Sequence, residues 1–168
     1  VFPSIICYWY RYSHDGVRID ADDSDADSTG GQFLHMLHDD KPTALHEQVM
    51  NCSLILYAEH EFNASTFTAR VCASTLSDIF SCVTGAIGTL RGPLHGGANE
   101  AAMAMLEQWQ TADEAEQAIL GMLTRKEKIM GFGHAVYRES DPRNGIIKEW
   151  ARKLAADVGD AVLMPVSE

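Results

Sequence analysis

Apolar residues recur along most of this chain at the three- and four-residue spacing that is typical of amphipathic α-helices. The segment 42–59 shows the pattern clearly, because Leu45, Val49, Cys52 and Leu56 fall on one face of a helix. No segment alternates apolar and polar residues convincingly as a half-buried strand does, and no internal repeat is present. The pattern therefore predicts an all-α protein.

Polar or glycine-rich stretches separate the helical segments. Two helix starts carry capping signals: Asp78, and Thr111 with Glu114 three residues later. The aromatic first segment is expected to be the end of a buried helix. Polarity rises after Asn99, where we expect a domain boundary. The predicted helices are 4–12, 32–38, 42–59, 63–74, 78–90, 96–110, one opened by Thr111, and 145–157, with loops at 15–29 and 131–144.

The composition is that of an ordinary globular protein, with 46% apolar and 22% charged residues. A net charge of −11 argues against nucleic acid or an anionic membrane as a partner. No apolar run reaches the roughly 18 residues of a membrane-spanning helix. The four cysteines form no CxxC pair and are predicted to be buried, reduced thiols. We therefore expect a cytoplasmic protein.

Three short patterns suggest ligand sites but are incomplete. Asp23-Ser-Asp25-Ala-Asp27 begins like a calcium loop, yet the glycine and the closing glutamate of that motif are missing. His35 and His38 share a helix face without an acidic or cysteine partner at supporting spacing. Gly131-Phe-Gly133 has only part of a dinucleotide-binding motif. We therefore predict no metal site and no nicotinamide site.

His95 and the loop 131–143 carry the strongest chemical signals. His95 lies between Pro93 and Gly96 on a tight turn at a helix start, where the helix dipole disfavours imidazolium. A neutral histidine can donate to a developing enolate oxygen, and the alternative role is helix capping. The loop presents His134, Arg138 and Arg143, which suits a polycarboxylate or a phosphate, and the alternative is a surface loop with a salt bridge. His60, taken alone, is more typical of a structural histidine.

Taken together, three sequence blocks resemble the citrate synthase family. They are Glu59-His-Glu-Phe-Asn63, Gly92-Pro-Leu-His-Gly-Gly-Ala-Asn-Glu100 and Gly131-Phe-Gly-His-Ala-Val-Tyr-Arg-Glu-Ser-Asp-Pro-Arg143, and the resemblance covers nearly the whole chain. Within the family, the similarity is greatest to the bacterial 2-methylcitrate synthases. That narrower similarity rests on Tyr8-Trp-Tyr10, Tyr12-Ser-His14, Phe33-Leu-His35 and residues 56–67.

The resemblance implies a multi-helical, homodimeric enzyme that condenses oxaloacetate with propionyl-CoA, or alternatively with acetyl-CoA. Residues 1–97 would belong to its large domain, and residues 98–168 would begin its small domain. The resemblance assigns His95 to the thioester carbonyl, His134 to the keto oxygen of oxaloacetate, and His60 and Arg143 to binding of oxaloacetate. It implies no cofactor beyond the acyl-CoA co-substrate. The residues implied for CoA binding are Lys128, Ile129, Met130, Gly131, Phe132 and Arg138.

One part of the implied site has no counterpart in this chain. The family's proton-abstracting base is an aspartate downstream of the loop, and neither Asp141, Asp157 nor Asp160 fits that place. We therefore expect the chain to be a central piece of a longer protein, truncated at both ends. The 168-residue piece alone is expected to lack synthase activity. The alternative from another class is a non-catalytic helical fragment that serves dimer assembly.

Overall fold

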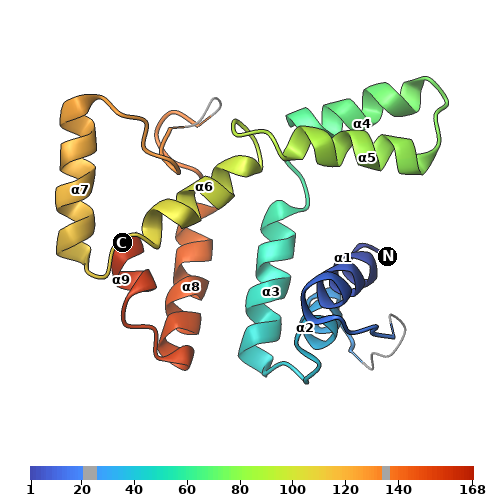
Figure 1. Cartoon of the computed structure of the whole chain (residues 1–168), viewed down its shortest axis with the longest axis horizontal. Helices are drawn as coiled ribbons and strands as arrows, with labels where there is room; N and C mark the ends of the chain where they lie inside the picture. Colours follow the sequence, from blue (N-terminus) through green and yellow to red (C-terminus); the bar gives the residue numbers. More distant parts are fainter. Residues whose placement is uncertain (21–25, 134–136) are drawn as a thin grey trace. The chain divides into compact units, whose positions relative to one another are not determined.

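The computed structural model describes residues 1–20, 26–133 and 137–168, and every regular element within these ranges is helical. The chain divides into two compact units (Figure 1). Unit 1 comprises Val1–Glu59 and Pro142–Val158, and unit 2 comprises His60–Asp141 and Gly159–Glu168. These units are not the segments 1–97 and 98–168, whose assignment to large and small domains remains a prediction about the whole protein.

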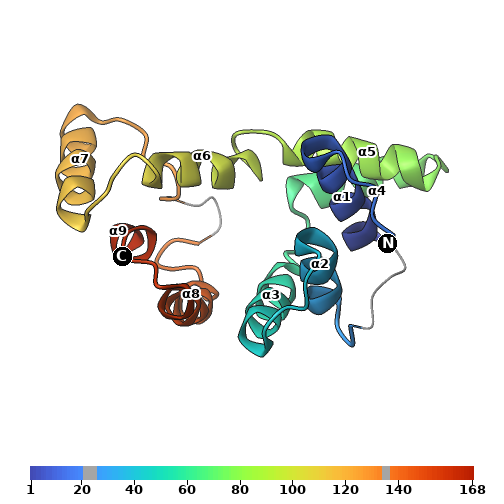
Figure 2. The ribbon, with the colours of Figure 1, turned by 60° about the horizontal axis from the view of Figure 1, so that its bottom comes forward.

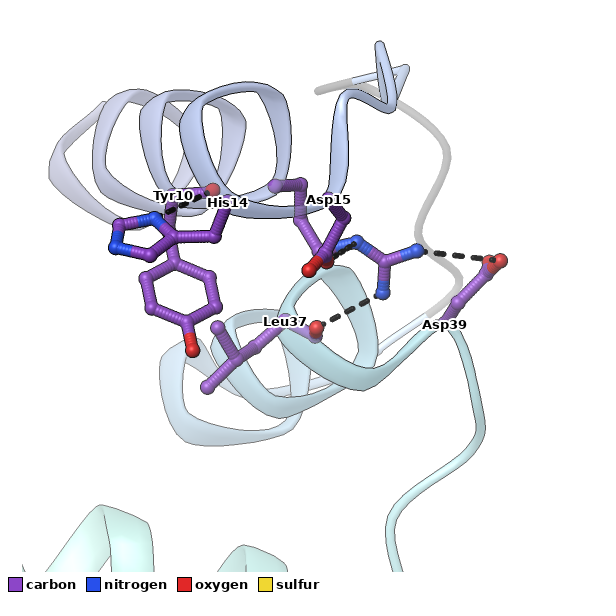
Figure 3. Close-up of polar contacts among 6 residues, drawn as sticks. Tyr10, His14, Asp15, Leu37 and Asp39 are labelled. Carbon is purple, nitrogen blue, oxygen red and sulfur yellow. Dashed lines mark hydrogen bonds and ion pairs between the residues drawn. The ribbon is translucent and has the colours of Figure 1, made fainter.

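Unit 1 begins with α1 (Phe2–Tyr10), which continues as a π-helical turn, Arg11–Asp15, and packs against α2 (Thr29–His38). The Arg11 guanidinium joins the two elements (Figure 3). Its Nη1 donates to the Leu37 carbonyl at 3.0 Å, and its Nε lies 3.1 Å from the Asp15 carboxylate. The Leu37 carbonyl belongs to the last turn of α2, where carbonyl groups lack helical partners and attract positive charge.

The prediction that the aromatic first helix is buried is wrong for this chain. Cys7 is fully buried, but Ile5 is 59% exposed and Trp9 is 62% exposed. The physical reason is that α1 packs through one face, which carries Cys7 toward the Phe33 carbonyl of α2. Its aromatic side chains instead contact the π-helical turn that follows, as Tyr8 stacks on Tyr12 and Tyr10 on His14.

The helix α2 starts three residues before its predicted start because Ser28 caps it, with Oγ accepting from the Gly31 N–H at 3.0 Å. The same hydroxyl donates to Glu47 of α3 (Ala44–Tyr57), and Asn51 of α3 accepts from the Gly30 N–H at 2.9 Å. A Cβ at Gly30 would lie 2.6 Å from Asn51 Oδ1, so only glycine allows this contact.

The other two helices of unit 1 that the structure describes are α3 and α8 (Asn144–Val158), which pack on each other. Thr43 caps α3, so this helix begins two residues after the predicted Pro42. His46 of α3 lies 3.1 Å from Asp157 of α8. The predicted helix at 145–157 is confirmed to within one residue at each end.

Unit 2 contains an antiparallel helical hairpin, α4 (Ala64–Ser74) and α5 (Ile79–Leu90), whose helices lie side by side in both views (Figure 1, Figure 2). Asp78 caps α5 as predicted, and its carboxylate accepts from the Ser81 N–H at 2.9 Å. The Thr68 and Thr89 hydroxyls bond across the hairpin at 2.9 Å. A Cβ added at the small residue Gly85 would lie 3.5 Å from the Thr68 methyl group, which reflects the close approach of the two helices.

The remaining helices of unit 2 are α6 (Gly97–Leu106), α7 (Ala112–Arg125) and α9 (Leu163–Ser167). Thr111 caps α7 as predicted, while Glu114 accepts from the Gln110 N–H. The short α9 has no predicted counterpart. It begins because the Asp160 carboxylate accepts three backbone N–H groups of residues 162–164, at 2.8–2.9 Å, which also lowers the pKa of Asp160.

All four cysteines are free thiols, as expected, but only Cys7 and Cys82 are buried, and burial raises the pKa of both thiols. Cys52 and Cys72 are half-buried, which corrects that part of the prediction. Among the helices that the structure describes, none is both long enough and apolar enough to cross a membrane.

Candidate functional site

His95 lies on a tight turn immediately before α6, where its N–H donates to the Gly92 carbonyl at 2.9 Å. The two glycines that follow are required because the backbone here passes very close to the end of α5. A Cβ at Gly96 would lie 2.7 Å from Leu90, and a Cβ at Gly97 would lie 2.6 Å from the Arg91 carbonyl oxygen. The glycine pair therefore folds the chain back on the end of α5 and presents the histidine there.

The half-buried His95 ring reaches the start of another helix. Its Nε2 lies 2.9 Å from the Ser65 hydroxyl and accepts from the Ser65 backbone N–H at 3.3 Å. Ser65 is in the first turn of α4, where backbone N–H groups have no helical partner. The side chain therefore does not cap α6, as the alternative role required. The helix N-terminus that it contacts is that of α4, not that of its own helix.

The contact with Ser65 bears on the hydrogen of the His95 ring. A backbone N–H can only donate, so its 3.3 Å contact with Nε2 favours the tautomer whose hydrogen lies on Nδ1. Asn63, the N-cap of α4, accepts from the Thr66 N–H at 3.0 Å, and its Oδ1 lies 2.8 Å from the Ser65 hydroxyl oxygen, whose single hydrogen can go either to Asn63 or to His95 Nε2. These bonds hold Ser65 beside the ring. In this tautomer Nδ1 carries the hydrogen and can donate to a ligand carbonyl.

His60 lies in the irregular link between α3 and α4 and is half-buried. Its Nε2 is 3.1 Å from the Tyr137 hydroxyl oxygen, and the two rings meet edge to face with centroids 5.7 Å apart. The predicted helix 42–59 ends earlier, at Tyr57, so His60 stands outside regular structure.

Arg143 lies directly before α8 in unit 1 and is described within that unit. Its Nη1 is 3.5 Å from the Leu56 carbonyl oxygen, and its guanidinium carbon is 5.9 Å from the Tyr57 ring centroid. Both partners belong to the last turn of α3, where free carbonyl groups attract a cation. The guanidinium is thus held at a helix end and half-buried.

The segment Lys128–Phe132 is an irregular turn after α7, as its glycine suggested. Gly131 has a φ of +89°, a conformation that favours glycine, and a Cβ there would lie 3.6 Å from the Ala102 methyl group of α6. Such a turn exposes backbone N–H and C=O groups, which suits the edge of a heterocyclic base. Arg138 is exposed.

Two of the aspartates considered as a base have structural partners. Asp157 pairs with His46, and Asp160 holds the start of α9. His134 lies outside the described residues, as do Asp23 and Asp25 of the acidic loop. Within the part of the chain that is described, no group of three or more His, Cys, Asp or Glu residues could hold a metal ion.

Sequence reasoning missed three residues that position the site: Asn63, Ser65 and Tyr137. Asn63 carries a signal, because asparagine directly before an apolar helical segment is a typical N-cap. Ser65 and Tyr137 stand within the quoted motifs, but their contacts span 30 and 77 residues of sequence, so spacing did not reveal them.

Comparisons with known proteins agree over the whole chain. Residues 1–168 match the family model described as citrate synthase, C-terminal domain. The chain is 70% identical over 166 residues to the 2-methylcitrate synthase of Shewanella oneidensis, and 47% identical over 142 residues to the citrate/2-methylcitrate synthase of Bacillus subtilis. A citrate synthase structure from Thermoplasma acidophilum, in a ternary complex with carboxymethyl coenzyme A and oxaloacetate, matches with a TM-score of 0.86 and 35% identity.

These matches cover 99%, 84% and 98% of this chain, respectively, but only 44%, 38% and 43% of the three relatives. The chain thus spans less than half the length of each of them. The likeness to the solved structure confirms the expected multi-helical, all-α fold.

Proposed function

Because this chain belongs to the citrate synthase family, we propose that the protein that contains it is a 2-methylcitrate synthase. The reaction joins propionyl-CoA, oxaloacetate and water to give 2-methylcitrate and CoA. The 70% identity to a 2-methylcitrate synthase over 99% of this chain supports this choice of substrate.

The geometry of His95 carries the proposal. Removal of a proton beside a thioester carbonyl places negative charge on the carbonyl oxygen, and a donor aimed at that oxygen stabilises the enolate. We propose that the Nδ1–H of His95 is this donor, a role supported by the contacts of Nε2 with Ser65. In this mechanism the enolate carbon then attacks the keto carbon of oxaloacetate, and water hydrolyses the thioester.

His60, His134 and Arg143 are proposed to bind oxaloacetate, with His134 donating to the keto oxygen as the new bond forms. A guanidinium pairs with a carboxylate at two points, and Arg143 is already held at the end of α3. We assign the CoA adenine to the backbone of Lys128–Phe132 and a CoA phosphate to Arg138. Histidine donors supply the electrophilic role, so the proposal includes no metal and no cofactor.

The proton-abstracting base is proposed to be an aspartate elsewhere in the whole protein, because Asp157 and Asp160 serve structural contacts here. The proposal also includes a homodimer, with neither a membrane nor nucleic acid as partner. The free thiols suit the reducing conditions of the cytoplasm, where we place the enzyme.

The second candidate is citrate synthase, since a Bacillus subtilis relative is named for both activities. The two acyl groups differ by one methylene, and a pocket that discriminates one methylene gains only about 1–3 kcal/mol of free energy. The test measures CoA release by the full-length protein with oxaloacetate and either propionyl-CoA or acetyl-CoA. A higher kcat/KM for propionyl-CoA is expected, and a preference for acetyl-CoA would select the second candidate.

The 168-residue chain by itself is proposed to be inactive, because the base is proposed to lie elsewhere in the whole protein. Purified chain incubated with propionyl-CoA and oxaloacetate should release no CoA above the background. Measurable release would contradict this, whereas an inactive but dimeric piece would fit the alternative of a helical assembly fragment.

A further inference from the structure

We infer that Tyr137 is a positioning residue that orients His60 for binding of the keto acid, an inference that rests on the proposed function. Two contacts between these side chains carry it. The Tyr137 hydroxyl oxygen lies 3.1 Å from His60 Nε2, and the rings meet edge to face at an interplanar angle of 76°. The polar contact influences which ring nitrogen of His60 carries the hydrogen, and the ring contact restrains the plane of the imidazole.

His60 needs such a partner because no helix restrains it. The helix α3 ends at Tyr57, α4 begins at Ala64, and Glu61 between them has a φ of +52°. A side chain on such a link is not limited by a preceding helical turn, so its rotamer depends on tertiary contacts. The half-buried Tyr137 comes from the loop between α7 and α8 and supplies them.

The chemistry of the pair fits binding of a dicarboxylate. When the phenol O–H donates to Nε2, the ring hydrogen of His60 lies on Nδ1. That nitrogen then presents a donor to a carboxylate or keto oxygen. The opposite tautomer would present a lone pair to an anion, which is repulsive. A phenol that donates thus fixes the tautomer while the ring contact fixes the ring direction, and Phe at this position would keep only the ring contact.

The test is a double-mutant cycle in the full-length protein: wild type, Tyr137→Phe, His60→Ala and the double variant. The measured quantities are the Kd for oxaloacetate by calorimetry, the KM for propionyl-CoA, and kcat. Loss of one hydrogen bond should weaken oxaloacetate binding about three- to tenfold in Y137F, with the KM for propionyl-CoA changed less than twofold. Tyr12→Phe, the same change at an exposed tyrosine, is the matched control and should equal wild type.

If Tyr137 acts through His60, the effects of the two substitutions on the oxaloacetate Kd are not additive. Y137F should therefore change this Kd less than twofold in the His60→Ala background. An equal effect in both backgrounds, or no effect in either, would overturn the inference while the wild-type activity still supported the proposed function. A general fall in kcat and melting temperature without a selective loss of oxaloacetate affinity would also overturn it. A wild-type protein that neither binds nor consumes oxaloacetate would overturn the proposed function and the inference together.

Discussion

His95 and His60 belong to the same unit but are held in different ways. His95 stands on a turn closed by short backbone bonds, and its ring meets the first turn of α4 through a backbone N–H and a hydroxyl. His60 stands on an irregular link and meets a side chain from another irregular segment. One histidine is positioned against a helix end, and the other is positioned by contact between two loops.

The difference has a physical consequence. A helix N-terminus offers a free N–H whatever its sequence, so the tautomer of His95 survives many substitutions. The described contact of His60 Nε2 is with one phenol hydroxyl, which a single substitution removes. We therefore expect substitutions around His95 to lower mainly kcat, and substitutions around His60 to weaken mainly the binding of oxaloacetate.

The largest effect is expected from His95→Ala in the full-length protein. Loss of a donor to a developing oxyanion lowers kcat by about 10²–10³-fold, here measured as CoA release. His38→Ala, at an exposed histidine of α2, should retain wild-type turnover. Turnover within threefold of wild type in H95A would remove His95 from the mechanism.

The second-largest effect is expected at Ser65, where a substitution should affect the His95 region without affecting the His60 region. Ser65→Ala removes the hydroxyl beside Nε2 but keeps the backbone N–H, so kcat should fall about tenfold, as for one lost hydrogen bond. The KM for oxaloacetate should stay unchanged, and Ser65→Thr should restore most of the turnover. Ser74→Ala, at the exposed end of α4, is the control. If Ser65→Ala changed only the KM for oxaloacetate and not kcat, the proposed difference between the His95 and His60 regions would be wrong.

A smaller effect is expected from Asn63→Ala, which removes the N-cap that also holds Ser65. The free energy of unfolding in urea should fall by about 1 kcal/mol, whereas Asn63→Asp keeps a capping oxygen and should be nearly neutral. Equal stability of N63A and wild type would show that the start of α4 is held by other contacts.

The smallest expected effect is a pH dependence of local stability at the start of α5, in the α4–α5 hairpin. The backbone and hydroxyl bonds from Ser81 hold the pKa of Asp78 below its ordinary value. A lowered pKa in the folded state means that the stabilisation is present above the unfolded-state pKa and is lost as the pH falls through the folded-state value. Protection of the Ser81 amide from hydrogen exchange should therefore decrease at acid pH. Asp78→Asn caps without titrating, so its protection should lack this decrease.

Much of the fold was predictable because its signals are local. The caps at Asp78 and Thr111, and the apolar spacing of 42–59, involve residues three or four apart. The failures also have local causes. Gly30 and Gly31 hid the start of α2, since glycine is a poor helix former, and the five-residue α9 is too short for a periodic pattern.

The sequence by itself determined the helical class, most helix starts and the identity of the candidate histidines, because helix periodicity and capping act over a few residues. Only the tertiary structure decided which nitrogen of each ring is occupied. Ser65 meets His95 across 30 residues of sequence and Tyr137 meets His60 across 77. Such pairs form when packing brings distant segments together, and no spacing along the chain encodes them.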